Sequence, residues 1–540
     1  KPLRCFYQLI KLMFDIIITN GTIIDGTGKA KFQSDIGIIG ERIEAIDNLS
    51  NPESKRIIDA TNLIVAPGFI DTHTHSEGDL LVNPEHQYGL RQGITTELLG
   101  IDGMSYSPLS HENYLIYRHW LSGLLGYPPA DLDMSSISSF KQHYHNKVSI
   151  NTAYLIPNGT VRLEVAGFKD IPLDATKMSE YKKLVEKGFE DGAVGFSTGS
   201  SYYPGPWTST EELIEICKLV KELNGVYMSE PRKANPERAF KGGGIAEALE
   251  VTEKSGVKLH IAHYRTDPTN AGDIKSLMSL IDKSKSNGSD ISLDIYPYPS
   301  GSTIPVSYIP SWAQDGGPNK LLERLNNPSE KKKIVDELEQ NENYSRRVDE
   351  MIFSYSPNHP ELEGATLPDL AKSRNISIGE ALCDLLISEN LELGYVMPPP
   401  VNLSLWRQVS KDCMELLARD DYMVCSDITP AGSMPHPRTY GAFPRILGRL
   451  HRTFNTMSLE DLVHRMTGRP ASRFGLTHRG KIHKGYFADI TIFDANKVID
   501  TSTYDDPKQY PSGIPYVIVN GQISIDNEVY TGIKSGKAIP

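Results

Sequence analysis

The middle of the chain alternates short apolar runs with longer amphipathic stretches. The apolar runs end in polar or turn-forming residues, which is typical of buried parallel strands. Eight strands are predicted, over residues 65–71, 94–99, 151–156, 193–197, 225–229, 257–262, 291–296 and 422–427. Helical patterns lie between them, for example over Thr210–Leu223 and Ile245–Ser255. Eight strands separated by helices favour an α/β fold with a (β/α)8 barrel.

Both ends of the chain show a different pattern, in which strand-like runs follow one another without helices. Residues 15–26 predict two strands around Asn20-Gly21, a strong hairpin signal, and residues 34–46 show the same strand-like pattern. Residues 488–494 and 516–523 are similar at the other end. We therefore predict one small β-sandwich built from both termini. The predicted division is residues 14–66 and 476–540 for the sandwich and 67–475 for the barrel.

Residues 303–420 form a connection far longer than a normal link between barrel strands. The stretch contains a charged helical pattern over Asn327–Asn343 and a proline-rich run over residues 397–400. We predict that it is an inserted cap over the mouth of the barrel. A solvated decoration or an oligomer contact is the alternative.

Composition narrows the class of protein. The length of 540 residues favours more than one domain, and 39% hydrophobic and 23% charged residues are usual for a soluble globular chain. The net charge of -12 argues against nonspecific nucleic-acid binding. Five scattered cysteines favour reduced thiols and a cytoplasmic location, and no run predicts a membrane span. Lys11 interrupts any signal-peptide core, and we expect Met13 to be the natural start.

The apolar run that starts at Ala66 leads into two histidines one residue apart. Because side chains alternate along a strand, His73 and His75 can present two imidazoles to one metal ion. Such a pair is common by chance, but further metal-ligating residues also follow strand-like runs. These residues are Asp102, Glu230, His263 and Asp427. Since barrels of this type carry their active sites at the C-terminal ends of the strands, the pattern predicts a metal-dependent hydrolase.

Several longer motifs together resemble the amidohydrolase superfamily, and specifically its D-aminoacylases, the N-acyl-D-amino-acid deacylases. The motifs are PGFIDTHTH, DGAVGFSTGSSYYPG, DIYPYPSGST, HPRTYGAFPRILGRL and MTGRPASRFGLTHRGKIHKGYFADITIFD. The resemblance covers residues 14 to 535. It implies a distorted TIM barrel beside a small β-sandwich, one or two zinc ions, and amide hydrolysis by a metal-bound water.

The resemblance also assigns roles to single residues. The implied metal ligands are His73, His75, His263 and Asp427, of which Asp427 would also shuttle the proton. Arg438 would grip the substrate carboxylate. The positions that would line the substrate pocket are Tyr202, Arg265, Tyr296 and Ser302. At Arg265 the family more often has lysine.

Three positions depart from the family pattern. Asp102 replaces a bridging cysteine, Glu230 replaces a histidine ligand, and Asn158 replaces another histidine. Carboxylates still bind metals, so we predict Asp102 and Glu230 as ligands and Asp102 as a bridge between two ions. An oxygen-rich site shifts the preference towards manganese or iron, although zinc remains the first expectation. The alternative for Glu230 is a structural partner to Arg232 or Arg265. For Asn158, an oxyanion donor and a turn-stabilising residue are both open, and His260 is expected to be structural.

The leading prediction is hydrolysis of N-acyl-D-amino acids to a D-amino acid and a carboxylate. A cyclic-amide hydrolase of the dihydroorotase or hydantoinase type is the runner-up. A non-catalytic relic that has lost its metal is a third hypothesis. The expected partner is a small-molecule substrate, with no nucleic acid and no membrane, and a homo-oligomer is left open.

Overall fold

The centre of the chain forms a barrel of eight parallel strands. The computed structural model describes residues 13–49, 53–199, 201–232, 235–340 and 350–540. The strands are β8 (Phe69–Asp71), β9 (Ile94–Leu99), β10 (Asn151–Pro157), β11 (Gly195–Gly199), β12 (Val226–Glu230), β13 (Lys258–Ile261), β14 (Ile291–Ile295) and β18 (Tyr422–Val424). They pair in the order β18-β14-β13-β12-β11-β10-β9-β8, each with its neighbour along the chain. The predicted α/β barrel is confirmed.

The barrel closes just beyond the ends of its first and last strands. Thr74 and Ile428 form a parallel bridge there. The N–H of Asp427 donates to the carbonyl of His73, and the N–H of His75 donates to the carbonyl of Ile428, each over 2.9 Å. The segments that close the barrel are therefore the ones that carry three of the predicted metal ligands.

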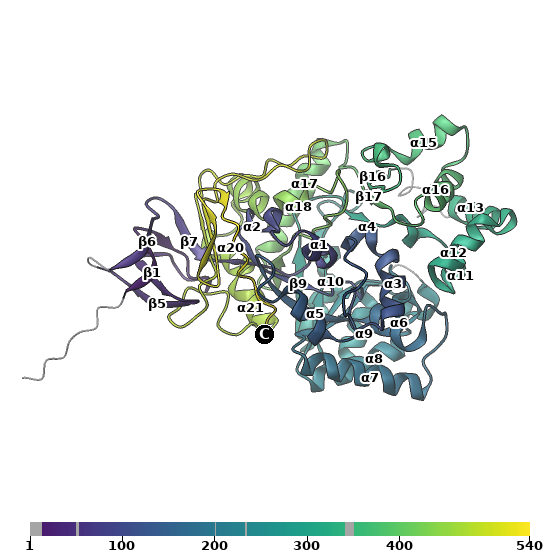
Figure 1. The fold of residues 1–540 in the computed structure, drawn as a ribbon, viewed down its shortest axis with the longest axis horizontal. Coiled ribbons are helices and arrows are strands. Elements are labelled where there is room, and N and C mark those ends of the chain that lie inside the picture. The colour runs from purple at the N-terminus through teal and green to yellow at the C-terminus, as the bar shows by residue number, and fades with distance from the viewer. Residues whose placement is uncertain (1–12, 50–52, 200, 233–234, 341–349) are drawn as a thin grey trace, which may run out of the picture.

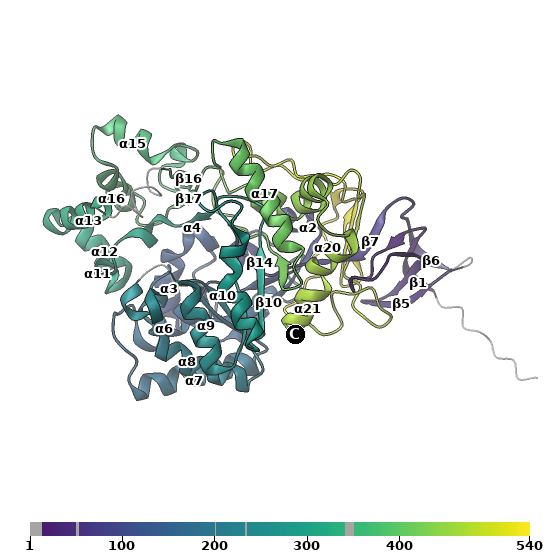
Figure 2. The same ribbon diagram turned by 180° about the vertical axis from the view of Figure 1, so that it is seen from behind.

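Amphipathic helices cover the outside of the barrel (Figures 1 and 2). They include α7 (Ala175–Glu190), α8 (Thr210–Glu222), α9 (Gly244–Ser255), α10 (Ile274–Ser286) and α17 (Leu403–Leu417). In α8, Ser209 caps the N-terminus in a capping box with Glu212, and Leu213, Ile216 and Val220 are buried on one face. None of the described helices is long and apolar enough to cross a membrane.

The two termini build a pair of packed sheets at one end of the molecule (Figure 1). One sheet has the order β5 (Arg42–Asp47), β4 (Asp35–Ile39), β1 (Phe14–Thr19) and β6 (Ser54–Asp59). The other has the order β22 (Val529–Tyr530), β21 (Gln522–Asp526), β20 (Tyr516–Val519), β19 (Ile490–Phe493), β7 (Ile64–Pro67), β2 (Thr22–Ile23) and β3 (Phe32–Gln33). Buried isoleucines from both sheets, such as Ile38 and Ile490, share one core. The expected separate β-domain is present.

The predicted hairpin around Asn20-Gly21 is wrong. β1 pairs with β4 and β6, whereas β2 pairs with β3 and β7 in the other sheet. The Asn20 side chain donates to Asp59 over 3.0 Å, and a Cβ on Gly21 would lie 2.5 Å from Val65 Cγ2. The Asn-Gly pair therefore carries the chain from one sheet to the other instead of turning it back.

One predicted strand, over residues 65–71, is two strands in two sheets. β7 belongs to the terminal β-domain and β8 to the barrel, with Gly68 between them. A Cβ on Gly68 would lie 2.1 Å from Thr95 Oγ1, so only glycine lets the chain pass there. Gly68 marks the passage from the β-domain into the barrel.

The long connection between β14 and β18 contains a small antiparallel sheet and several helices, at the end of the molecule opposite the β-domain (Figure 1). The sheet has the order β15 (Ser302–Thr303), β17 (Gly394–Val396) and β16 (Ile352–Tyr355). The charged helix predicted over Asn327–Asn343 is α13 (Pro328–Gln340), and residues 341–343 lie outside the described part of the chain. The last part of the predicted 303–420 segment is α17, which contacts β18 and covers the barrel.

Candidate metal centre

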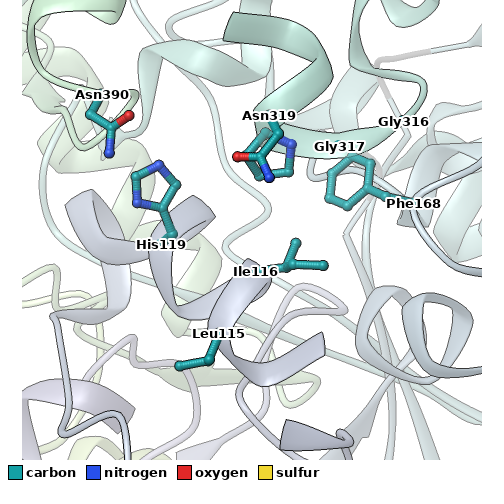
Figure 3. A pocket seen from close by; sticks show the side chains of 9 residues that line it. Leu115, Ile116, His119, Phe168, Gly316, Gly317, Asn319 and Asn390 are labelled. Atoms are coloured by element: carbon teal, nitrogen blue, oxygen red, sulfur yellow. The ribbon is translucent and has the colours of Figure 1, made fainter. Parts of the chain in front are cut away.

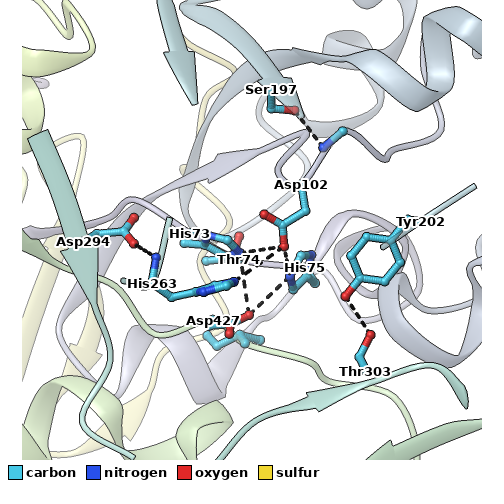
Figure 4. Close-up of polar contacts among 12 residues, drawn as sticks. His73, Thr74, His75, Asp102, Ser197, Tyr202, His263, Asp294, Thr303 and Asp427 are labelled. Atoms are coloured by element: carbon cyan, nitrogen blue, oxygen red, sulfur yellow. Dashed lines mark hydrogen bonds and ion pairs between the residues drawn. The ribbon is translucent and has the colours of Figure 1, made fainter. Parts of the chain in front are cut away.

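Five of the predicted site residues converge beyond the C-terminal ends of four barrel strands (Figure 4). Asp102 Oδ2 lies in their middle. It is 3.2 Å from His73 Nε2, 3.5 Å from His75 Nε2 and 3.9 Å from His263 Nε2. Asp427 Oδ1 lies 3.2 Å from His75 Nε2 and 3.7 Å from His73 Nε2. The segments that follow β8, β9, β13 and β18 thus bring three imidazoles and two carboxylates to one place.

These side chains form two overlapping groups of metal-ligating atoms. His73, His75 and Asp427 make one group, and His73, Asp102 and His263 make the other. Within each group the ligand atoms lie within 4.8 Å of one another. The imidazole nitrogens and carboxylate oxygens of this donor set suit zinc, manganese or iron. His73 belongs to both groups, and Asp102 of the second group also lies 3.5 Å from His75 of the first.

Three of the converging residues have a left-handed backbone. The φ angles are 53° at Asp102, 32° at His263 and 56° at Asp427. Residues other than glycine adopt this region rarely and at an energetic cost, and such residues gather at functional sites. Because each residue follows a strand, the turn aims its side chain across the barrel mouth.

Two buried carboxylates behind the centre hold these turns in place. Asp71 Oδ1 accepts from the backbone N–H groups of Ser426 over 2.9 Å and His73 over 3.2 Å. Asp294 Oδ1 accepts from the backbone N–H of His263 over 2.5 Å. Neither aspartate was predicted from the sequence. Their position at a strand end was the available signal, but it also marked many structural residues.

Asp294 also ties the centre to the barrel interior. Its Oδ2 accepts from Thr72 Oγ1 over 2.7 Å and lies 2.9 Å from His260 Nε2. The other ring nitrogen of His260 lies 2.8 Å from Ser292 Oγ. His260 is completely buried and holds Asp294, so its predicted structural role agrees with these contacts.

The charges of the centre call for a cation. Burial alone would lower the pKa of His73, but Asp102 and Asp427 raise it to about 10. Burial would raise the pKa of Asp102, but His73 and His75 hold it well below its usual range. Burial lowers the pKa of His263 to about 4. A buried proton on an imidazole thus balances the carboxylates, and a divalent ion would supply the same balance.

One buried polar atom without a partner supports this fit. It is Asp102 Oδ1, the second oxygen of the carboxylate at the centre. Polar atoms in protein interiors almost always find partners, and the exceptions gather where an ion or water belongs. Asp102 Oδ1 is a further oxygen available to an ion beside the two groups.

The predicted substrate-binding residues surround the centre. Arg438 Nη1 lies 2.7 Å from Asp427 Oδ2, and its Nη2 donates to the carbonyl of Ser302 over 3.2 Å. Arg265 donates to the hydroxyl of Tyr296 over 2.5 Å, and its guanidinium lies 3.8 Å from the centroid of that ring. The Arg438 guanidinium lies 4.7 Å from the same centroid. Both arginines therefore pack against the Tyr296 ring.

Two further predicted residues, Tyr202 and Ser302, make contacts in the inserted sheet. The Tyr202 hydroxyl lies 2.7 Å from Thr303 Oγ1. Ser302 Oγ donates to the carbonyl of Tyr395 over 2.8 Å. Ser302 therefore holds β15 against β17, while its carbonyl faces Arg438.

Glu230 lies at the end of β12, with 6% of its surface exposed, and is not a member of either ligand group. The alternative partner Arg232 forms its ion pair with Glu247 over 2.7 Å. Asn158 accepts from Tyr181 over 2.7 Å and donates to Thr208 over 3.1 Å, which favours a structural role. The metal role of Glu230 stays a prediction.

A cavity of about 320 Å³ lies between the barrel helix α3 (His111–Trp120) and the inserted helix α12 (Gly317–Asn326) (Figure 3). Leu115, Ile116 and Phe168 line it, together with His119 and Asn319. It contains none of the residues of the metal cluster and lies where the insertion meets the barrel.

Comparison with known proteins places the chain in a family. A model of the amidohydrolase family matches residues 392–525. D-aminoacylase of Alcaligenes xylosoxydans xylosoxydans is 30% identical over 543 residues, which cover 97% of this chain and 97% of the relative. The chain belongs to the D-aminoacylase family. N-acyl-D-glutamate deacylase of the same organism is also 30% identical, over 94% of this chain and 93% of the relative.

Solved structures of the D-aminoacylase family share the fold along the whole chain. N-acyl-D-glutamate deacylase from Bordetella bronchiseptica, complexed with zinc and a phosphonate mimic of the tetrahedral intermediate, has a TM-score of 0.81 and 28% identity. The match covers 98% of this chain and 100% of that one. D-hydantoinase, with 15% identity and a TM-score of 0.54, shares the fold alone. The family resemblance seen in the motifs is confirmed.

Proposed function

We propose that this chain is a metal-dependent hydrolase that cleaves N-acyl-D-amino acids to a D-amino acid and a carboxylate. One observation carries the proposal. Asp427 lies 3.2 Å from His75, in the candidate metal centre, and 2.7 Å from Arg438. A group that binds a metal and a group that binds a carboxylate therefore meet on one side chain. An acyl amino acid presents its scissile amide one carbon away from its carboxylate, which fits that spacing.

One or two divalent ions would be held by His73, His75, Asp102, His263 and Asp427. When bound, the metal polarises the amide carbonyl and makes a water acidic enough to attack near neutral pH. Zinc is the first expectation, because the structure of a relative contains it. The carboxylate of Asp102 makes manganese or iron acceptable as well.

Asp427 is the group that moves the proton. It takes the proton of the attacking water and returns it to the leaving nitrogen. Its Oδ1 faces the two histidines and would bind an ion, so Oδ2, which Arg438 engages, is the atom that would carry the proton once Arg438 releases it. Asp71, through Ser426 and His73, fixes the turn on which Asp427 stands.

Arg438, Arg265 and Tyr296 would bind the substrate carboxylate. A planar guanidinium matches a carboxylate with two parallel hydrogen bonds, which lysine cannot reproduce. We also propose that the inserted sheet caps the site. Support comes from Ser302 and Thr303, which contact Arg438 and Tyr202.

The function is tested with a panel of N-acetyl-D- and N-acetyl-L-amino acids. The protein is reconstituted separately with zinc, manganese and iron, and amine release is measured. We expect turnover of the D-isomers only. No turnover with metal bound would favour a cyclic amide and overturn the proposal. No turnover together with no bound metal would favour the non-catalytic hypothesis.

Glu230→Gln tests whether Glu230, the remaining predicted ligand, binds a metal ion. If Glu230 binds an ion, the variant should hold fewer metal ions per chain, because a neutral amide is a weaker ligand than a carboxylate. Metal content is measured by atomic emission after dialysis. Glu237→Gln, seven residues later and exposed, is the control. Unchanged metal content in Glu230→Gln would assign that residue to structure.

Location and assembly stay predictions. The described cysteines Cys217, Cys383, Cys413 and Cys425 are free and buried, which agrees with the expected reduced thiols. A cytoplasmic location, the absence of nucleic-acid and membrane partners, and the oligomeric state rest on the sequence. The small-molecule substrate is common to the named family members.

A further inference from the structure

A second cavity lies at the opposite end of the barrel from the metal centre. Its volume is about 310 Å³, which is enough for a small organic ligand. Lys258 and Ile291, which open β13 and β14, line it, together with Met423 of β18. Since the metal ligands follow the C-terminal strand ends, this cavity is at the N-terminal end.

The remaining wall comes from two helices that lie between the barrel and the β-domain (Figures 1 and 2). They are α20 (Leu459–Met466) and α21 (Gly468–Arg473). His464 of α20 and both Arg469 and Arg473 of α21 line the cavity. Arg469 and Arg473 are four residues apart on one short helix, so their side chains share a face.

Positive charge exceeds negative charge in this cavity. Its cationic side chains are Lys258, Arg469 and Arg473, and its carboxylate is Asp290. Arg473 pairs with Asp290 over 2.5 Å, and Lys258 donates to the side chain of Asn224 over 2.9 Å. One carboxylate therefore faces three cations.

Arg469 is the cation that lacks a partner. No hydrogen bond or ion pair joins its guanidinium to any described residue, and its Nε is buried. Arg473 Nε is also buried without a partner, and only 9% of the Arg473 side chain is exposed. Two like charges four residues apart repel each other and destabilise a helix, and a buried polar atom without a partner adds to that cost. An anion between them would remove both costs.

We propose that this cavity is a binding site for a small polyvalent oxyanion, such as a phosphate monoester or a dicarboxylate. Arg469 is its principal ligand, Arg473 Nε contributes from the same helix, and Lys258 contributes from the barrel wall. Guanidinium groups bind both phosphates and carboxylates through paired hydrogen bonds. The site is separate from the metal centre, so the proposal does not depend on the catalysed reaction.

Binding is tested on the metal-loaded protein by titration calorimetry. The probes are inorganic phosphate, glycerol 3-phosphate and succinate. We expect saturable binding of at least one probe, and Arg469→Ala should weaken it about tenfold or more, as expected for the loss of a charge-assisted contact. Lys258→Ala should weaken the same probe. The probe with the highest affinity tells a phosphate site from a carboxylate site.

Two controls make the result decisive. Arg374→Ala removes an exposed arginine from the inserted helix α15 (Leu367–Arg374) and should leave binding unchanged. Circular dichroism and metal content of Arg469→Ala should match those of the unmodified protein, which shows that the fold and the metal centre are intact. Absence of saturable binding by all probes, or binding that Arg469→Ala and Lys258→Ala leave unchanged, would overturn the proposal. Unchanged binding would place the anion elsewhere, for example at Arg438.

Discussion

Asp427→Asn is expected to lower kcat by about 10²- to 10⁴-fold, the range found for loss of a general acid–base group. Asparagine keeps the shape of the side chain but cannot accept and return a proton. In the native protein, Arg438 and His75 hold the pKa of Asp427 below its usual range against the opposing effect of burial, so it is ionised before the reaction begins. The measurement is steady-state amine release from an N-acetyl-D-amino acid.

Asp420→Asn is the matched control, because Asp420 precedes the same strand but its side chain is 87% exposed. It should retain normal kcat. Circular dichroism and metal content of both variants separate loss of proton transfer from loss of the fold or of an ion. Near-normal kcat in Asp427→Asn would remove Asp427 from the proton path.

The barrel was predictable because each of its strands is buried on both faces. β9 is completely buried and coincides with the predicted residues 94–99. The predicted strand over residues 422–427 ends at Val424 in the structure, because Asp427 turns into the left-handed region to reach the centre. The apolar pattern thus locates a strand, but it does not show where the chain leaves the strand to place a ligand.

The pairing of the terminal strands was less predictable. Asn520-Gly521 does join the hairpin of β20 and β21, whereas Asn20-Gly21 joins strands of different sheets. Both residues of Asn520-Gly521 have the positive φ of a tight hairpin turn, whereas in Asn20-Gly21 only Asn20 does. What separates them is the packing partner, such as Val65 beside Gly21, and that partner is distant in sequence.

The metal ligands were predictable to different degrees. His73 and His75 are found by their spacing, and Asp102 could be placed because it replaces a residue of the family motif. Asp294 was missed, because its role depends on contacts with Thr72 and His263 that only the closed barrel creates. The only local signal of such a residue is its place at a strand end, which many structural residues share.

Arg438 is placed to act on both the substrate and Asp427. It is 1% exposed, and its Nη1 and Nη2 are already engaged by Asp427 and Ser302. To bind a substrate carboxylate with both Nη1 and Nη2, Arg438 must loosen its contact with Asp427. That release would free Asp427 Oδ2 when substrate is present, so carboxylate binding and proton transfer are expected to be coupled.

Arg438→Met is therefore expected to lower kcat/KM for N-acetyl-D-amino acids by about 100-fold or more, as is usual when one partner of a buried charge pair is removed. Arg438→Lys keeps the charge without the planar fork and should recover part of the loss. The corresponding N-acetyl-D-amino-acid amides, which lack the carboxylate, are assayed in parallel. With these amides the loss should be much smaller, because only the effect on Asp427 remains.

Arg445→Met provides the matched control, because Arg445 is a buried arginine that pairs with Asp500 over 2.9 Å, away from the metal cluster. It should affect stability without distinguishing the acid from the amide substrate. An equal loss of kcat/KM for both substrates in Arg438→Met would mean that Arg438 acts through Asp427 alone. A loss confined to the acid substrate would mean that Arg438 recognises the carboxylate and leaves proton transfer to Asp427. If Arg438 moves from Asp427 to the substrate, the loss of kcat/KM is large for the acid and small, but measurable, for the amide. Only this intermediate pattern supports the coupling.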